Sequence, residues 1–344
     1  MFLTRILTLS LISLISAAPV RAEPAGLGEA IRLSGSARLA GFVLTDPDLP
    51  APVRAAGEGL LSRIGHGQAP TVGEGALSVS PFLRHDPNLN GGFPDDHIMA
   101  GGFRFEIAER DRAVSGLIAG VNLSYGWRRG LGGGTALELR SGLSFGRALE
   151  HNLNKGSVGA EACLRHQARR DLYLHGCLDL SGSRYELGET RRAGARIGVT
   201  RLMTGYGGAH ELTFEGRVER QLDPTPYERG VIAASLISAM PGPVVYSARA
   251  ELGAPVDGVL VTRYRLQLGA TFELLDRPTR ISLDWRQAEG GSFLGSERVD
   301  RTTTLSVSRP LTDRVRLSVS LTRNASSADP YDRDTLGVGV SMRF

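Results

Sequence analysis

The chain ends in Thr335-Leu336-Gly337-Val338-Gly339-Val340-Ser341-Met342-Arg343-Phe344. Successive side chains of an extended strand point to opposite faces, so one face of this stretch carries Leu336, Val338, Val340, Met342 and Phe344. The opposite face carries glycine, serine and arginine. An apolar face backed by a small or polar face, with an aromatic residue at the carboxyl end, is typical of a transmembrane β-barrel strand. A half-buried strand of a soluble β-sandwich has the same alternation, so the rest of the chain must distinguish the two.

The first 22 residues have the features of a secretory signal peptide. Arg5 supplies the positive charge, residues 6–15 are largely apolar, and Val20-Arg21-Ala22 offers a small-residue cleavage site. The apolar part, residues 6–20, is shorter than the roughly 20 residues that a membrane-spanning helix needs. We therefore expect an exported protein, and outward apolar strands in an exported protein indicate the outer membrane of a Gram-negative cell.

Composition agrees with an exported barrel and argues against nucleic-acid binding. The chain has 44 glycines and 22% charged residues. Barrels carry their apolar signal on alternate residues, so their average hydropathy stays close to that of soluble proteins. Loss of Arg5 and Arg21 with the signal peptide lowers the formal net charge from +4 to +2. Because this charge is small and no basic run is interleaved with aromatic residues, we expect no nucleic-acid partner.

Alternating hydropathy and turn signals predict a long series of strands. They cover residues 76–85, 113–127, 135–147, 157–167, 172–181, 192–203, 209–221, 227–239, 243–252, 261–274, 279–288, 299–309, 314–323 and 334–344. Fourteen strands in one series predict an all-β fold, an antiparallel up-and-down transmembrane barrel with both chain termini in the periplasm.

The connections between these strands give independent support, because long and short ones alternate. The long connections are residues 86–112, 148–156, 182–191, 222–226, 253–260, 289–298 and 324–333, and the short ones are 128–134, 168–171, 204–208, 240–242, 275–278 and 310–313. Transmembrane barrels have short periplasmic turns and longer extracellular loops, whereas a soluble sandwich has no reason to alternate them.

Residues 23–72 form a separate region before the barrel, which we expect to occupy residues 73–344. Helical spacing predicts one helix from Ala30 to Val43 and another from Pro52 to Ile64, joined by a turn at Asp46–Pro50. Such a pair is too small to bury a core of its own. It either leans on or plugs the periplasmic end of the barrel, or it is a mobile leader.

Charged residues gather on the strand faces that would line the lumen. The predicted lumen-lining residues are Arg140, Arg165, Arg196, Arg217, Arg249, Arg263, Arg265, Arg280, Arg286, Arg316, Glu215, Glu273 and Asp284. Mixed charge of this kind most simply indicates cross-strand ion pairs in a hydrated interior. An anion-selective filter is the sharper alternative.

Cys163 and Cys177 are the only cysteines in the sequence. The turn between their strands centres on Arg170, so directly opposed residues have numbers that add up to about 340, and these two do. Both also fall on the inward face. We therefore expect a cross-strand disulfide, which an oxidising periplasm permits, with two free thiols as the alternative. With no close second pair of ligands, we expect no metal site.

The sequence gives no sign of catalysis. Its histidines are scattered, no pair of them has helical metal-binding spacing, and no H-E-x-x-H motif is present. A hydrolase would need a nucleophile, a base and an orienting residue to converge in space. We expect no catalytic residues, no cofactor and no enzyme activity.

Two stretches of the sequence suggest a family. The segment Asp86-Pro87-Asn88-Leu89-Asn90-Gly91-Gly92 resembles the segment that opens the barrel of surface lipoprotein assembly modifiers (Slam proteins), and the last hairpin, through residues 321–324, 331–334 and 338–344, is similar to that family's closing hairpin. The resemblance covers residues 76–344 and implies a fourteen-stranded barrel that helps lipoproteins reach the outer leaflet. Members with this transport activity carry a tetratricopeptide-repeat domain before the barrel, whereas only about 50 residues precede it here.

Two functions follow from these observations. In the first, the barrel assists delivery of client lipoproteins to the cell surface, as the resemblance implies. In the second, it is a porin-like channel for small solutes with an anion preference. In either case the expected partners are outer-membrane lipids and the barrel insertion machinery, for which the terminal aromatic Phe344 is the predicted assembly signal.

Overall fold

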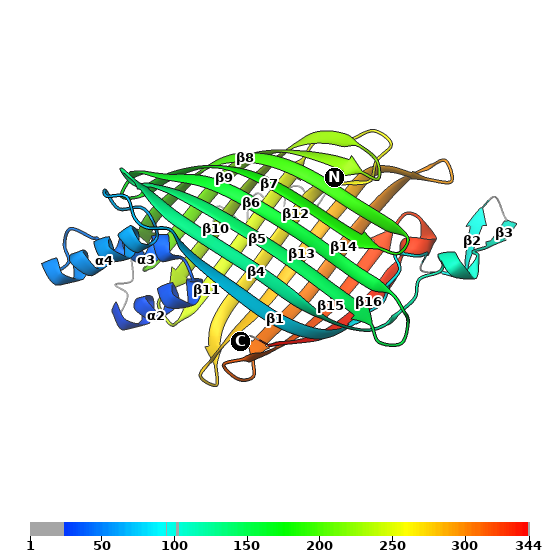
Figure 1. Cartoon of the computed structure of the whole chain (residues 1–344), viewed down its shortest axis with the longest axis horizontal. Coiled ribbons are helices and arrows are strands. Elements are labelled where there is room, and N and C mark those ends of the chain that lie inside the picture. Colours follow the sequence, from blue (N-terminus) through cyan, green and yellow to red (C-terminus); the bar gives the residue numbers. More distant parts are fainter. Residues whose placement is uncertain (1–23, 94, 101–102, 343–344) are drawn as a thin grey trace.

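The computed structural model describes residues 24–93, 95–100 and 103–342, so the predicted signal peptide and Phe344 lie outside the described residues. Fourteen antiparallel strands close into one barrel, which β1 and β16 complete by pairing with each other (Figure 1). The strands are β1 (Glu74–Asp86), β4 (Gly116–Gly132), β5 (Thr135–Ala148), β6 (Asn154–Arg169), β7 (Leu172–Tyr185), β8 (Gly188–Gly205), β9 (Gly208–Asp223), β10 (Tyr227–Met240), β11 (Val244–Gly253), β12 (Val261–Leu274), β13 (Arg277–Phe293), β14 (Ser296–Pro310), β15 (Val315–Ser326) and β16 (Arg333–Met342). The predicted fold class is confirmed.

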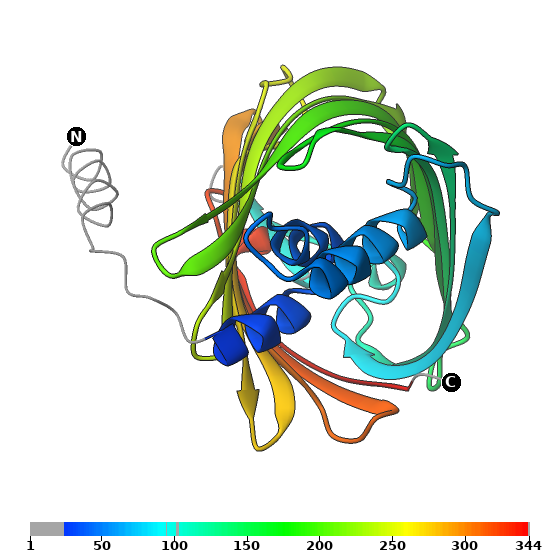
Figure 2. The ribbon, with the colours of Figure 1, turned by 90° about the vertical axis from the view of Figure 1, so that its left-hand side faces the viewer.

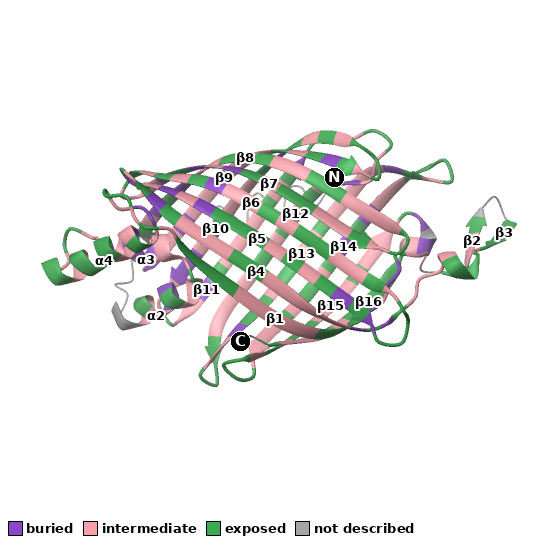
Figure 3. Ribbon diagram, viewed as in Figure 1, coloured by how far each residue is buried: buried purple, intermediate pink, exposed green. Residues whose placement is uncertain are grey.

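The barrel wall has two chemically different faces. On β7 the outward side chains are exposed leucines and the inward ones are buried: Leu174, Leu178 and Leu180 against Tyr173, His175 and Cys177. Every barrel strand carries at least one large exposed apolar side chain in this way. Exposed residues alternate with less exposed ones along many of the strands in Figure 3. Soluble proteins rarely expose an apolar surface of such extent to water, whereas a barrel in a membrane presents such a surface to the lipid chains. The chain is therefore a membrane-spanning β-barrel of the outer-membrane type.

Two of the predicted long connections are continuations of the strands. β7 and β8 run on to a turn at residues 186–187, and β13 and β14 to a turn at residues 294–295. In the second turn φ is +50° at Leu294 and +85° at Gly295, the backbone that a two-residue hairpin turn needs. Beyond the membrane, water lies on both faces of a strand. The hydropathy of the sequence therefore stops alternating there, although the two strands remain paired.

The first long connection contains a hairpin that the alternation did not predict. β2 (His97–Ala100) and β3 (Phe103–Glu106) form a separate two-stranded sheet, and the 3-10 helix η2 (Glu109–Asp111) follows them. The hairpin projects past the end of the barrel opposite to the helices (Figure 1). Strands of four residues are too short for an alternating pattern to stand out from the surrounding polar residues.

The N-terminal region contains α2 (Pro24–Ser34), α3 (Ala37–Leu44) and α4 (Ala51–Arg63). The single helix predicted from Ala30 to Val43 is wrong, because the chain breaks at Gly35. Gly35 has a φ of +66°, which glycine adopts without strain, and the Ser36 side chain caps α3 by accepting a hydrogen bond from the Leu39 N–H at 3.1 Å. Among the described residues, no helix combines the length and the apolar character that spanning a bilayer requires.

Candidate functional site

The register places twelve of the thirteen predicted lumen residues on the inner face of the barrel. Inward positions of neighbouring strands lie opposite each other, as Arg140 does to Glu161 and Gln267 to Asp284. The inward set comprises Arg140, Arg165, Arg196, Arg217, Arg249, Arg265, Arg280, Arg286, Arg316, Glu215, Glu273 and Asp284. The inside of the barrel is therefore a charged surface.

Arg263 is the exception, and its predicted position in the lumen is wrong. The register between β12 and β13 shifts between Thr262 and Tyr264, so Arg263 is the extra residue of a β-bulge. Its guanidinium lies over the ring of Tyr264, which points outward, and 3.7 Å from Glu289. A bulge reverses the face on which a side chain emerges, and strict alternation along the sequence cannot reveal it.

On one wall of the lumen, formed by β4 to β6, a buried carboxylate forms ion pairs with several arginines. Glu138 lies 2.8 Å from Arg128, 2.9 Å from Arg165 and 3.2 Å from Arg140, measured between side-chain nitrogen and oxygen atoms. The contacts connect three neighbouring strands. Because the carboxylate is almost fully buried, it needs these partners, and the pairing cancels part of the positive charge of the wall.

A second network continues the same pattern across β6 to β11. Glu215 accepts a hydrogen bond from Arg249 Nη1 at 3.0 Å and lies 3.0 Å from His175 Nε2. The arginine of the neighbouring strand, Arg196, pairs with Glu161, and Arg217 pairs with Glu219 at 2.8 Å. The charges of this part of the lumen are thus largely neutralised by each other.

The wall from β10 to β15 is different. It lines a lumen cavity of about 630 Å³ whose polar side chains are Ser235, Ser247, Arg249, Arg265, Gln267, Arg280, Ser282, Asp284, Arg286, Thr302, Thr304, Ser306 and Thr322. Asp284 accepts from Arg265 Nη2 at 2.5 Å and from Gln267 Nε2 at 2.6 Å. Within the described part of the chain, Arg280, Arg286 and Arg316 have no acidic partner, and all three are exposed. This wall therefore carries an excess of positive charge.

Cys163 and Cys177 lie directly opposite each other on β6 and β7 and form a disulfide. Their Cα atoms are 4.1 Å apart, both side chains are buried, and Arg196 Nη2 lies 3.9 Å from Cys163 Sγ. Glu161 is close to both sulfur atoms, but sulfurs that are bonded to each other offer no thiolate to a metal ion. The bond crosses between two strands that are already paired, so it reinforces the local register.

We expect protein purified without reductant to have no thiol that an alkylating reagent can label, even after denaturation, because both sulfurs are bonded. Denaturation together with reductant should expose two thiols. The measurement is the mass of the alkylated protein in the two samples. Labelling of two thiols in the denatured sample without reductant would show that the disulfide does not form.

The helices cover one end of the barrel, where they lie across its mouth (Figure 2). Glu211 on β9 binds both the hydroxyl of Ser36 and the guanidinium of Arg38. Two further ion pairs support this contact: Arg32 with Glu273 at 2.8 Å, and Asp46 with Arg170 at 3.1 Å. The predicted docking of this region on the barrel end is thus seen, and Glu211 is a site residue that the sequence analysis did not single out.

Apolar contacts accompany these ion pairs. Leu39 and Phe42 of α3, with Ala30 and Ile31 of α2, pack against inward side chains at the rim, namely Tyr173, Leu202, Ala209, Ala239 and Val245. After α4, the buried His66 ring lies 5.0 Å from that of Tyr173, and its Nδ1 is 3.0 Å from Gly134 O. Burial lowers the pKa of the His66 imidazole below its usual value. Burial in the docked segment therefore favours the neutral form of the ring.

The segment that resembles the Slam opening motif lies at the opposite end. Asn90 is buried there; its amide donates to Arg112 O at 2.7 Å, and its Oδ1 accepts from Val114 N at 3.0 Å. Its backbone oxygen accepts from Leu187 N in the β7–β8 turn at 3.0 Å. The Phe93 ring lies 5.9 Å from that of Tyr331 between β15 and β16. These contacts join distant hairpins, so the segment ties the rim together.

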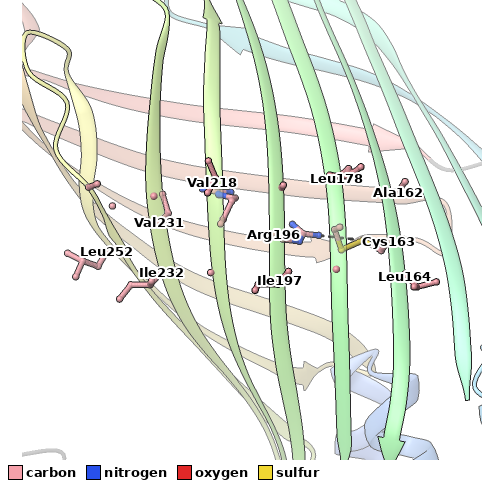
Figure 4. A pocket seen from close by; sticks show the side chains of 18 of the residues that line it. Ala162, Cys163, Leu164, Leu178, Arg196, Ile197, Val218, Val231, Ile232 and Leu252 are labelled. Atoms are coloured by element: carbon pink, nitrogen blue, oxygen red, sulfur yellow. Dashed lines mark hydrogen bonds between the residues drawn. A yellow bond between two sulfur atoms is a disulfide. The ribbon is translucent and has the colours of Figure 1, made fainter.

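A wide recess also indents the outer wall (Figure 4). Its volume is about 1090 Å³, and its walls are apolar side chains of neighbouring strands, including Leu164, Leu178, Ile197, Val218, Ile232 and Leu252. The small residues Gly176, Ala195 and Gly216 lie among them. Because it is apolar and lies on the lipid-facing side, the recess is part of the membrane belt.

One stretch has the spacing of a hydrolase motif. Gly142-Leu143-Ser144-Phe145-Gly146 matches G-x-S-x-G, in which the serine of a hydrolase sits on a sharp strand-to-helix turn. Here the whole stretch lies within β5, and Ser144 is opposite Asn122 and Ser157 on the neighbouring strands. The extended backbone does not provide the turn that this chemistry needs.

No family model matches the sequence, and no curated protein is significantly similar to it. Solved structures with a similar fold include OpdK from Pseudomonas aeruginosa, with 9% identity, a TM-score of 0.43, and coverage of 78% of this chain and 98% of that one. OccK2 (OpdF) from P. aeruginosa has 8% identity, a TM-score of 0.42, and coverage of 79% and 97%. A BenF-like porin from Pseudomonas fluorescens Pf-5 has 6% identity, a TM-score of 0.41, and coverage of 79% and 98%. Likenesses this distant assign no function to the barrel.

Proposed function

We propose that the protein is an outer-membrane channel for small solutes and that its lumen prefers anions. The observation that carries this proposal is the group of exposed arginines on the inner wall that have no acidic partner among the described residues, Arg280, Arg286 and Arg316. Side chains that point inward and are still exposed require water inside the barrel. Guanidinium groups in a narrow aqueous space surrounded by protein and lipid attract anions and repel cations, because the low-dielectric wall concentrates their field.

We propose further that the helix-covered end faces the periplasm, with both termini on that side. The short turns at residues 133–134, 170–171, 206–207, 241–243 and 275–276 lie at this end of the strands, and the connection with β2 and β3 lies at the other. Barrels of this class place short turns in the periplasm and long connections outside the cell.

The purified protein is expected to form discrete conductance steps in planar lipid bilayers. Under a potassium chloride gradient, its reversal potential should indicate a chloride-to-potassium permeability ratio above one, because Arg280 and Arg286, which line the lumen cavity, have no acidic partner among the described residues. Mock-purified membranes from cells without the protein are the control. Absence of steps from correctly folded protein would contradict the channel, and cation preference would contradict the role of the arginines.

Delivery of lipoproteins to the cell surface is a second candidate, which follows from the resemblance to Slam proteins. One observation favours it: the β2–β3 hairpin projects past the barrel and leaves Phe103 and Phe105 exposed, at 71% and 54% of their full surface. Exposed aromatic side chains on a projecting element suit contact with another protein. In this case, deletion of the gene should remove a specific lipoprotein from the surface of intact cells, and a channel protein alone would not cause that loss.

A further inference from the structure

Two pairs of arginines lie directly opposite each other in the strand register of the described lumen. Arg196 on β8 faces Arg217 on β9, and Arg265 on β12 faces Arg286 on β13. Like charges in directly opposed positions of an antiparallel pair repel each other. Each pair therefore needs negative charge close by, and the two pairs obtain it differently.

For the Arg196–Arg217 pair, carboxylates of the barrel wall supply the negative charge. Arg196 pairs with Glu161, and Arg217 lies 2.8 Å from Glu219. Glu215 adds a further carboxylate 3.8 Å from Arg196. Both guanidinium groups thus have carboxylate partners within the wall.

In the Arg265–Arg286 pair, only Arg265 has a carboxylate partner among the described residues. Arg265 holds Asp284, which also accepts from Gln267. The other nearby carboxylate, Glu251, is held by Arg249 at 2.7 Å. In the part of the chain that the structure describes, Arg286 has no hydrogen-bond or ion-pair partner, and its side chain is exposed to the lumen cavity.

The surroundings of Arg286 suit a small polar ligand. Thr302 lies opposite it on β14, and the cavity of about 630 Å³ carries serine and threonine hydroxyls and the second unpaired arginine, Arg280. A guanidinium presents parallel N–H donors that match both oxygens of a carboxylate or a phosphate. Hydroxyl groups can bind the rest of a small organic acid.

We infer that Arg286, with Arg265 opposite it, forms a discrete binding site for the carboxylate or phosphate group of a small solute. The inference deepens the proposed channel function and depends on it for its physiological meaning: the site holds an anion briefly during passage, instead of only repelling cations. The bound anion supplies the charge that Asp284 and Glu251 leave missing at this pair.

The test measures binding and conduction separately. Isothermal titration of the folded barrel in detergent with succinate, and in a second series with inorganic phosphate, should give saturable binding. Arg286→Gln should weaken the affinity for the better of the two by at least about tenfold, the loss that follows from removing a charge-assisted contact. Arg286→Lys keeps the charge without the planar fork and should lie between the wild type and Arg286→Gln.

Arg301→Gln is the matched control. Arg301 lies next to Thr302 on β14, but it points outward, where it donates to Gln287 Oε1 at 3.1 Å. The same charge is removed at the same level of the barrel, and the affinity should change less than twofold. Equal weakening in both variants would show an effect of net charge only, and wild-type protein without saturable binding would overturn the site.

Chloride conductance of the same preparations separates this inference from the proposed function. Conducting protein without saturable anion binding would leave the channel standing and remove the site. Protein that binds anions at Arg286 without conducting would keep the site and remove the channel. The heat-modifiable mobility of each variant on gels shows that it is folded before either measurement is made.

Discussion

Replacing Glu211 by alanine is expected to release the helices from the mouth of the barrel. Only 4% of the Glu211 side chain is exposed, and it binds both Ser36 and Arg38, of which Arg38 is itself 22% exposed. Removing one partner of a buried pair leaves an uncompensated buried charge, which costs about 3–5 kcal/mol. That shifts the docking equilibrium by a factor of roughly 100 or more. The apolar packing of Leu39 and Phe42 and the two more exposed ion pairs at the rim then hold the helices.

The expected result is a larger single-channel conductance, together with faster proteolysis of residues 24–63 while the barrel stays resistant. Glu273→Ala is the matched control. Glu273 also binds a helix arginine at the barrel rim, but Arg32 is 61% exposed, and an exposed pair contributes only about 0–1 kcal/mol. Unchanged conductance and proteolysis in folded Glu211→Ala protein would mean that the remaining contacts keep the mouth covered without Glu211.

The barrel could be predicted from the sequence because a membrane gives each strand residue one of two environments. Lipid on one side and water on the other impose a period of two, which the fourteen strands follow except where a bulge interrupts the register. The same regularity located the cysteine pair, since consecutive antiparallel strands fix which residues oppose each other, and Cys163 does oppose Cys177. The local sequence pattern was therefore sufficient to predict the pairing between strands that are consecutive in the chain.

The features that escaped prediction depend on local exceptions or on distant contacts. Arg263 does not face the lumen, because a β-bulge at this position shifts the register of the strand. The predicted first helix is interrupted at Gly35, although the apolar spacing of the sequence continues past this residue. Docking of the helices requires Arg38 to meet Glu211, which is 173 residues away in the chain. No periodicity connects those two positions. The excess positive charge near Arg286 became visible only when its neighbours on β12 and β14 were known.

Replacing Leu143 by arginine is expected to prevent stable assembly, whereas the same replacement at the next residue is expected to be tolerated. Leu143 points outward on β5, between Leu123 and Val158 of the neighbouring strands. An arginine on the lipid face costs about 2–4 kcal/mol near the bilayer midplane. Ser144 points into the lumen, between Asn122 and Ser157. There water solvates an added guanidinium.

The two variants lie at the same depth and carry the same new charge, so a difference between them reports only which face each residue occupies. The measurements are the heat-modifiable folded fraction in outer-membrane preparations and the urea midpoint of unfolding in lipid vesicles. Leu143→Arg should lower both strongly, and Ser144→Arg should stay close to the wild type. If Ser144→Arg were the more damaging change, the faces of β5 would be reversed, and with them the register that places Glu138 and Arg140 in the lumen.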